Sequence, residues 1–133
     1  MRLIQSIKAR RALVIADTCQ SGAFSELQRD SAQISLEEFI KEFRSSANRI
    51  IIASSRASEI SQEAIQFRNG VFTHFLLKGL KGDADTDKDG FVTIEEAYDY
   101  TYAAIRKLSG YGQHPHFDGR VDGFFPLSIT RGR

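Results

Sequence analysis

Two short apolar runs interrupt the polar background of the chain and predict buried strands. One covers residues 12–16, and the other covers residues 49–54, where three consecutive isoleucines dominate. Each run is too short for a buried helix, and β-branched side chains favour extended backbone. Continuous apolar runs of this kind are typical of central strands covered on both faces, as in a parallel sheet.

Apolar residues at helical spacing predict the elements around these strands. This spacing occurs in the first turns of the chain and in residues 35–47, 70–81 and 94–108. Ser35 and Glu38 form a capping-box pair, and Gly82 is expected to end the third helix. The tail, residues 117–129, predicts a last short strand or an edge hairpin. This alternation indicates an α/β fold with a mostly parallel sheet flanked by helices.

Composition narrows the class of protein. The 133 residues fit one domain, and two confident strands are too few for a stable sheet, so the chain looks like part of a larger one. Eighteen basic and 17 acidic residues give a net charge of +1, which argues against binding to nucleic acid or to a membrane surface. The single cysteine excludes an internal disulfide, and no apolar run is long enough to cross a bilayer. We therefore expect a soluble, cytoplasmic protein.

The single cysteine, Cys19, lies two residues after the first predicted strand. Ligands of open α/β sheets bind at the carboxyl ends of the strands, which is the place expected for this thiol. Asp17 would point to the same side of an extended chain, and the residues around the cysteine are polar. A lone cysteine is more often a buried small apolar residue, but a core thiol would lie inside an apolar run. The context therefore favours a reactive thiol.

Residues 12–22, an apolar strand that runs into Asp-x-Cys-x-Ser-Gly, resemble the nucleophile segment of the caspase and metacaspase superfamily. Residues 51–56 and 70–77 are similar to the next strand and the following helix of bacterial caspase-like domains. The resemblance implies a partial caspase-haemoglobinase-like fold, of which residues 1–133 form only the C-terminal part. It also implies a cysteine-type endopeptidase that hydrolyses peptide or protein substrates.

The resemblance assigns roles to four residues. Cys19 would attack the peptide carbonyl, and its backbone N–H would help to hold the oxyanion. Asp17 would line the first specificity pocket and favour a basic residue before the scissile bond. Ser54 and Ser55, after the second strand, would form part of the pocket wall.

The general-base histidine of such peptidases precedes the cysteine by about 50 residues. Only 18 residues precede Cys19, and none is a histidine. We therefore expect an upstream segment or a second chain to supply the base, and the isolated chain to be inactive. His114 and His116 follow the cysteine, as in papain-like enzymes, but a surface loop held by Pro115 is the preferred interpretation. A helix-surface or packing role is expected for His74.

Residues 85–96 match a calcium-binding EF-hand loop position for position. Asp85, Asp87 and Asp89 occupy the first, third and fifth places, and a glycine occupies the sixth. Phe91 would offer its backbone carbonyl and Glu96 a bidentate carboxylate, so calcium is the expected ion. EF-hands usually occur in pairs, and an aspartate-rich connector between two helices is the alternative. A non-catalytic pseudo-peptidase scaffold or a calcium-binding regulatory domain therefore stays open beside the peptidase.

Overall fold

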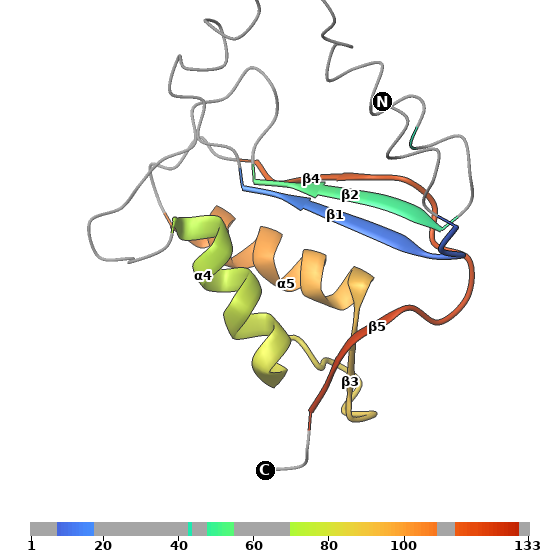
Figure 1. The fold of residues 1–133 in the computed structure, drawn as a ribbon. Coiled ribbons are helices and arrows are strands. Elements are labelled where there is room, and N and C mark those ends of the chain that lie inside the picture. Colours follow the sequence, from blue (N-terminus) through green and yellow to red (C-terminus); the bar gives the residue numbers. More distant parts are fainter. Residues whose placement is uncertain (1–7, 18–42, 44–47, 55–69, 109–113, 131–133) are drawn as a thin grey trace, which may run out of the picture.

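A three-stranded mixed sheet forms one layer of the protein in the computed structural model, which describes residues 8–17, 43, 48–54, 70–108 and 114–130. Its order is β1 (Ala12–Ala16), β2 (Arg49–Ala53) and β4 (His116–Asp118). β1 and β2 are parallel over five residue pairs, and β4 is antiparallel to β2 (Figure 1).

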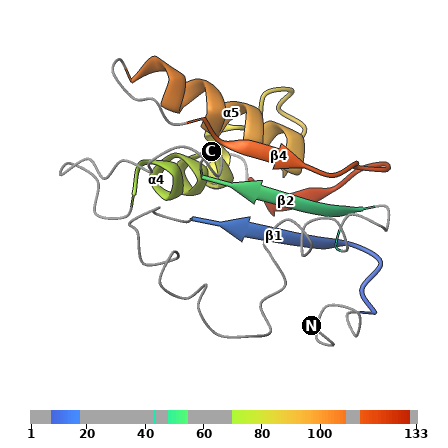
Figure 2. The ribbon, with the colours of Figure 1, turned by 90° about the horizontal axis from the view of Figure 1, so that it is seen from above.

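Two helices lie on one face of this sheet (Figure 1). α4 (Val71–Lys78) continues into the wider π-helical turn η2 (Gly79–Asp83), and α5 (Ile94–Lys107) returns toward the start of α4. Between the helices, β3 (Phe91–Thr93) pairs antiparallel with β5 (Pro126–Ile129) from the C-terminal tail. The view from above in Figure 2 shows β1 and β2 running side by side with β4 beyond them.

The core lies between the sheet and the two helices. Ile50 and Ile52 of β2 are fully buried, because the helices cover the sheet face to which they belong. The apolar positions at helical spacing provide the other side of the core: Val71, Phe72, Leu76, Ile94, Ala97 and Ile105. Burying such side chains stabilises the folded state by about 1.5–3 kcal/mol each.

The predicted strands and the two later helices are present, with small differences in their bounds. The expected burial on both faces is wrong for β1, which lies at the edge of the described sheet with Ile15 45% exposed, and the tail forms strands in two different sheets rather than a hairpin. The second strand ends at Ala53 rather than Ser54. The π-helical turn is assigned through Asp83, but Gly82 has a non-helical φ of 123°, so the helical backbone stops at this glycine as predicted. The expected helices in the first turns and in residues 35–47 lie outside the described residues, except that Phe43 is helical and buried.

The mixed α/β content is confirmed, but a mostly parallel sheet is not found among the described strands. Only β1 and β2 are parallel, whereas β4 and the β3–β5 pair are antiparallel. β4 begins with His116 opposite Ala53, at the end of β2. Since α5 ends near that edge of the sheet, the chain re-enters the sheet there and must run the opposite way (Figure 1). In the described part of the chain, no helix is long and apolar enough to cross a membrane.

Candidate metal centre and carboxyl edge of the sheet

The acidic loop between η2 and α5 is shaped by hydrogen bonds from its own aspartates. The Asp87 carboxylate accepts from the Asp89 backbone N–H at 3.1 Å, and the Asp89 carboxylate accepts from the Phe91 N–H at 2.8 Å. Lys88 and Gly90 have φ values of 60° and 88°, so the chain turns sharply between these bonds. A side chain other than glycine is strained in this region, which explains the glycine at the sixth place.

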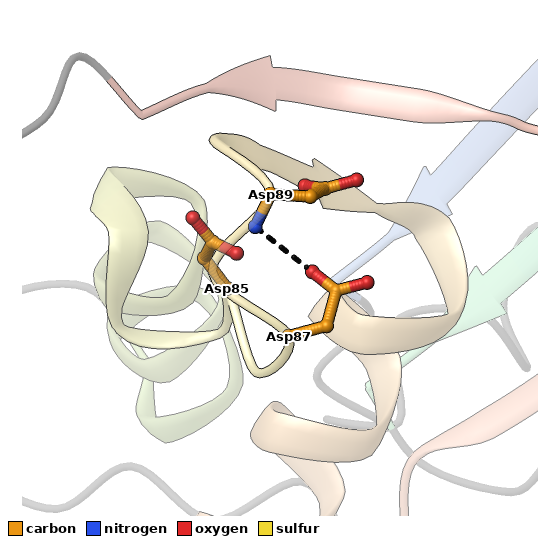
Figure 3. A group of neighbouring side chains, drawn as sticks. All are labelled: Asp85, Asp87 and Asp89. Atoms are coloured by element: carbon orange, nitrogen blue, oxygen red, sulfur yellow. Dashed lines mark hydrogen bonds between the residues drawn. The ribbon is translucent and has the colours of Figure 1, made fainter.

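Three predicted ligands lie together in this loop. Asp85, Asp87 and Asp89 each offer a carboxylate oxygen, and these oxygens lie within 4.8 Å of one another (Figure 3). Calcium binds oxygens at 2.3–2.6 Å, so two ligands of one ion are at most about 5 Å apart. The three carboxylates therefore lie close enough together to be ligands of one hard cation.

The two oxygens of Asp85 have different surroundings. Oδ2 accepts hydrogen bonds from the Gly90 backbone N–H at 3.2 Å and from the Thr130 hydroxyl at 2.7 Å. Oδ1 is buried and has no hydrogen-bond partner among the described residues. A buried carboxylate oxygen without a partner is unfavourable, and a bound cation would provide the missing interaction.

Glu96, the expected ligand at the twelfth place, does not join the three aspartates. Its Oε1 accepts from the Thr86 N–H at 3.0 Å, and its Oε2 accepts from the N–H and the hydroxyl of Thr93, both at 2.9 Å. With Thr93 as N-cap of α5, this is a capping box. Partial burial acts to raise the pKa of Glu96, but these bonds and one from the Asp87 backbone together lower it. The carboxylate is thus held ionised beside the loop.

Phe91, the expected carbonyl donor, begins β3 and pairs with Ile129 of β5. The sequence contains one such acidic loop, and its short strand is paired with the C-terminal tail. The tail thus covers the loop strand that a second EF-hand would otherwise pair with.

Two of the residues predicted for the peptidase, Asp17 and Ser54, lie at the carboxyl edge of the sheet. β1 and β2 end together there, since the Ser54 N–H donates to the Ala16 carbonyl at 2.9 Å. Ser54 is fully buried, and Asp17 is exposed directly after β1. Cys19 and Ser55 lie outside the described residues.

Asp17 contacts the first turn of α4. Its Oδ2 accepts a hydrogen bond from the Thr73 hydroxyl. No side chain of the helix itself caps α4 at its N-cap Gly70, as far as the described residues go. A carboxylate near a helix N-terminus is favourable, so Asp17 joins the end of β1 to the start of α4.

Each of the three histidines has a defined contact or position in the fold. His74 is exposed on α4, with its ring edge-to-face with Phe75 at 5.1 Å, as expected for a surface or packing role. His114 Nε2 lies 2.7 Å from a guanidinium nitrogen of Arg106. His116 begins β4 and therefore lies at the carboxyl edge of the sheet, next to β2. The expected surface loop is not found at His116, which belongs to β4, and Pro115 before it is buried, with its carbonyl accepting a hydrogen bond from the Tyr98 hydroxyl at 3.0 Å.

Sequence reasoning missed two threonines that orient carboxylates. Thr73 and Thr130 donate to Asp17 and Asp85 from positions 56 and 45 residues away. No local motif connects such distant positions, although the carboxylates themselves were predicted.

Comparison with known proteins does not assign a family or a function to this site. No protein-family model, no curated protein and no solved structure matches the chain.

Proposed function

We propose that the chain is the C-terminal part of a caspase-like cysteine endopeptidase domain, with a caspase-haemoglobinase-like fold and Cys19 as its nucleophile. The supporting observation is the parallel pairing of β1 with β2, which brings Asp17 to the carboxyl edge of the sheet. Functional groups of α/β sheets gather at this edge. Cys19 follows Asp17 by two residues, so the proposal places the thiol next to this edge.

In this proposal the Cys19 thiolate attacks the carbonyl carbon of the scissile peptide bond, and a histidine from an upstream segment or a second chain takes the thiol proton. The same histidine then protonates the leaving amine, and water hydrolyses the acyl-enzyme. Asp17 binds a basic side chain of the substrate. A carboxylate has about four lone-pair sites, so its bond to Thr73 is compatible with a second bond to a guanidinium or ammonium group.

Fluorogenic peptides with arginine, lysine or aspartate before the scissile bond test this proposal. The purified chain is expected to be inactive, and activity on the arginine and lysine peptides should appear when the upstream segment or partner chain is supplied. Cys19→Ala should abolish this activity, and Asp17→Asn should reduce the preference for basic residues. Turnover that is unchanged in Cys19→Ala would contradict the proposal, and absence of turnover in the completed protein would favour a non-catalytic scaffold.

A second proposed function is calcium binding by residues 85–96, favoured by the buried, unpartnered Oδ1 of Asp85 beside two further carboxylates. Three neighbouring anions repel one another, so a bound cation should stabilise the fold as well as the loop. Asp85, Asp87 and Asp89 would be ligands, and Glu96 would join them by exchanging its bonds to backbone N–H groups for the ion.

Calorimetric titration of EDTA-treated protein with calcium chloride, together with melting curves, tests the site. Calcium should release or absorb heat and raise the Tm, and Asp87→Asn should weaken both effects. Asp99→Asn is the matched control, because Asp99 is an exposed aspartate on α5 outside the loop. Calcium that produces neither heat nor a higher Tm in the unaltered protein would exclude the site.

A further inference from the structure

The C-terminal tail is attached to both sides of the acidic loop. The Ser128 hydroxyl of β5 donates to the Leu80 carbonyl at the end of the incoming helix, at 2.7 Å. The Thr130 backbone N–H donates to the Gly90 carbonyl at 2.8 Å, in the middle of the loop. The fit is close, since a Cβ on Gly82 would lie 3.2 Å from the Thr130 methyl group. The tail is therefore a structural part of this helix–loop–helix unit.

Thr130 also contributes to the difference between the two oxygens of Asp85. Its hydroxyl and the Gly90 N–H each donate one hydrogen bond to Oδ2. Oδ1 has none among the described residues and is buried. Because Oδ2 is held from two sides, the carboxylate cannot rotate without breaking a bond, which leaves Oδ1 as the oxygen without a hydrogen bond.

We infer that Thr130 is a positioning residue of the calcium site, and that the tail strand β5 and the metal stabilise one another. This inference rests on the proposed calcium site. Groups that hold metal ligands in place typically change metal affinity 10- to 100-fold when they are removed. Linkage makes the effect reciprocal: if the docked tail strengthens calcium binding, calcium strengthens the docking of the tail by the same factor.

Calcium affinity of three variants tests the role of the hydroxyl. Thr130→Val keeps the shape but removes the donor, and its calcium dissociation constant should rise about tenfold. Thr130→Ser keeps the donor and should stay within about threefold of the unaltered protein. Ser128→Ala is the matched control, since it removes a hydrogen bond of the same strand that does not reach Asp85. Because it loosens the tail without touching Asp85, it should raise the dissociation constant by less than Thr130→Val does, within about threefold.

Hydrogen exchange of the unaltered protein provides the reciprocal measurement, and it does not depend on the folding of a variant. Calcium should slow exchange of the Thr130 amide, which is bonded to the loop carbonyl of Gly90. Calcium binding with equal affinity in Thr130→Val, or binding that leaves this amide unchanged, would overturn the inference while the site survives. Absence of any calcium binding by the unaltered protein would instead overturn the proposed site, and the inference with it.

Discussion

Glu96 should stabilise the calcium-free protein through the start of α5. Its carboxylate accepts three hydrogen bonds, from the Thr86 N–H and from the N–H and hydroxyl of Thr93. Loss of a helix cap costs about 1 kcal/mol. Because Glu96 is only partly buried, we expect Glu96→Ala to lower the free energy of unfolding by about 1–2 kcal/mol. For a domain of this size that corresponds to a fall in Tm of roughly 3–7 °C.

Glu96→Gln separates charge from shape. An amide has one acceptor oxygen, whereas Glu96 uses both of its oxygens, so glutamine must turn its NH₂ group toward one of the two backbone donors. We expect a loss of stability close to that of alanine. Glu95→Gln is the control, because Glu95 is exposed in the same first turn and its replacement removes the same charge near the helix N-terminus.

The stabilisation by Glu96 should decrease as the pH falls. Burial alone would raise the pKa of Glu96, but the hydrogen bonds from Thr93, Thr86 and Asp87 outweigh it, and the folded-state pKa is lowered. The charged form therefore contributes stability above the pKa of an unfolded glutamate, and this contribution is lost as the pH falls through the lower, folded-state pKa.

Thermal unfolding followed by far-UV circular dichroism in EDTA measures this contribution. The gap in Tm between Glu95→Gln and Glu96→Gln should be largest near neutral pH, begin to narrow below the pKa of an unfolded glutamate, about 4.3, and close only below the lowered folded-state pKa. A gap that is absent near neutral pH, or that stays constant as the carboxylates are protonated, would refute the capping argument.

Two further predictions concern the sheet. Gly119 has a φ of 119°, and a Cβ there would lie 2.3 Å from the Arg49 carbonyl oxygen, so Gly119→Ala should destabilise the protein by about 3 kcal/mol in urea titrations. Gly123→Ala, also at positive φ but with 4.0 Å of clearance, should cost only about 1 kcal/mol; equal losses would mean that the clash is relieved. Thr73→Val removes the donor to Asp17 and should lower stability by about 1 kcal/mol, whereas Thr73→Ser should not; a Tm for Thr73→Val equal to that of Thr73→Ser would contradict this role.

The sequence predicted the elements whose apolar pattern is continuous or periodic. β1 and β2 are apolar runs, and α5 repeats apolar residues at helical spacing, so one local pattern suffices for each. β4 and β5 lack such a signal, because they have three and four residues and their side chains are only partly buried. β4 and β5 belong to two different sheets. The strand with which each one pairs depends on where the chain leaves α5, which is a property of the whole fold.

For the candidate metal centre, too, the sequence predicted the local contacts and missed the distant one. The positions of Asp85, Asp87 and Asp89 are local, since a short loop must bring alternate residues to one side. The engagement of Glu96 with the start of α5 follows from Thr93 three residues earlier, a capping pattern that coincides with the twelfth ligand position. The contact of Thr130 is not local, because it requires the tail to pair with β3.

The two proposed sites lie at opposite ends of the same helices. Asp17 bonds to Thr73 in the first turn of α4, whereas Asp85 follows the end of η2 (Figure 1). At about 1.5 Å per residue, the helical run between them is roughly 18 Å long. A cation at the loop is therefore too far away to touch a substrate at the carboxyl edge. If both proposals hold, calcium could act on cleavage only through the packing of α4 against the sheet, so a loop variant that lowers activity should lower stability too.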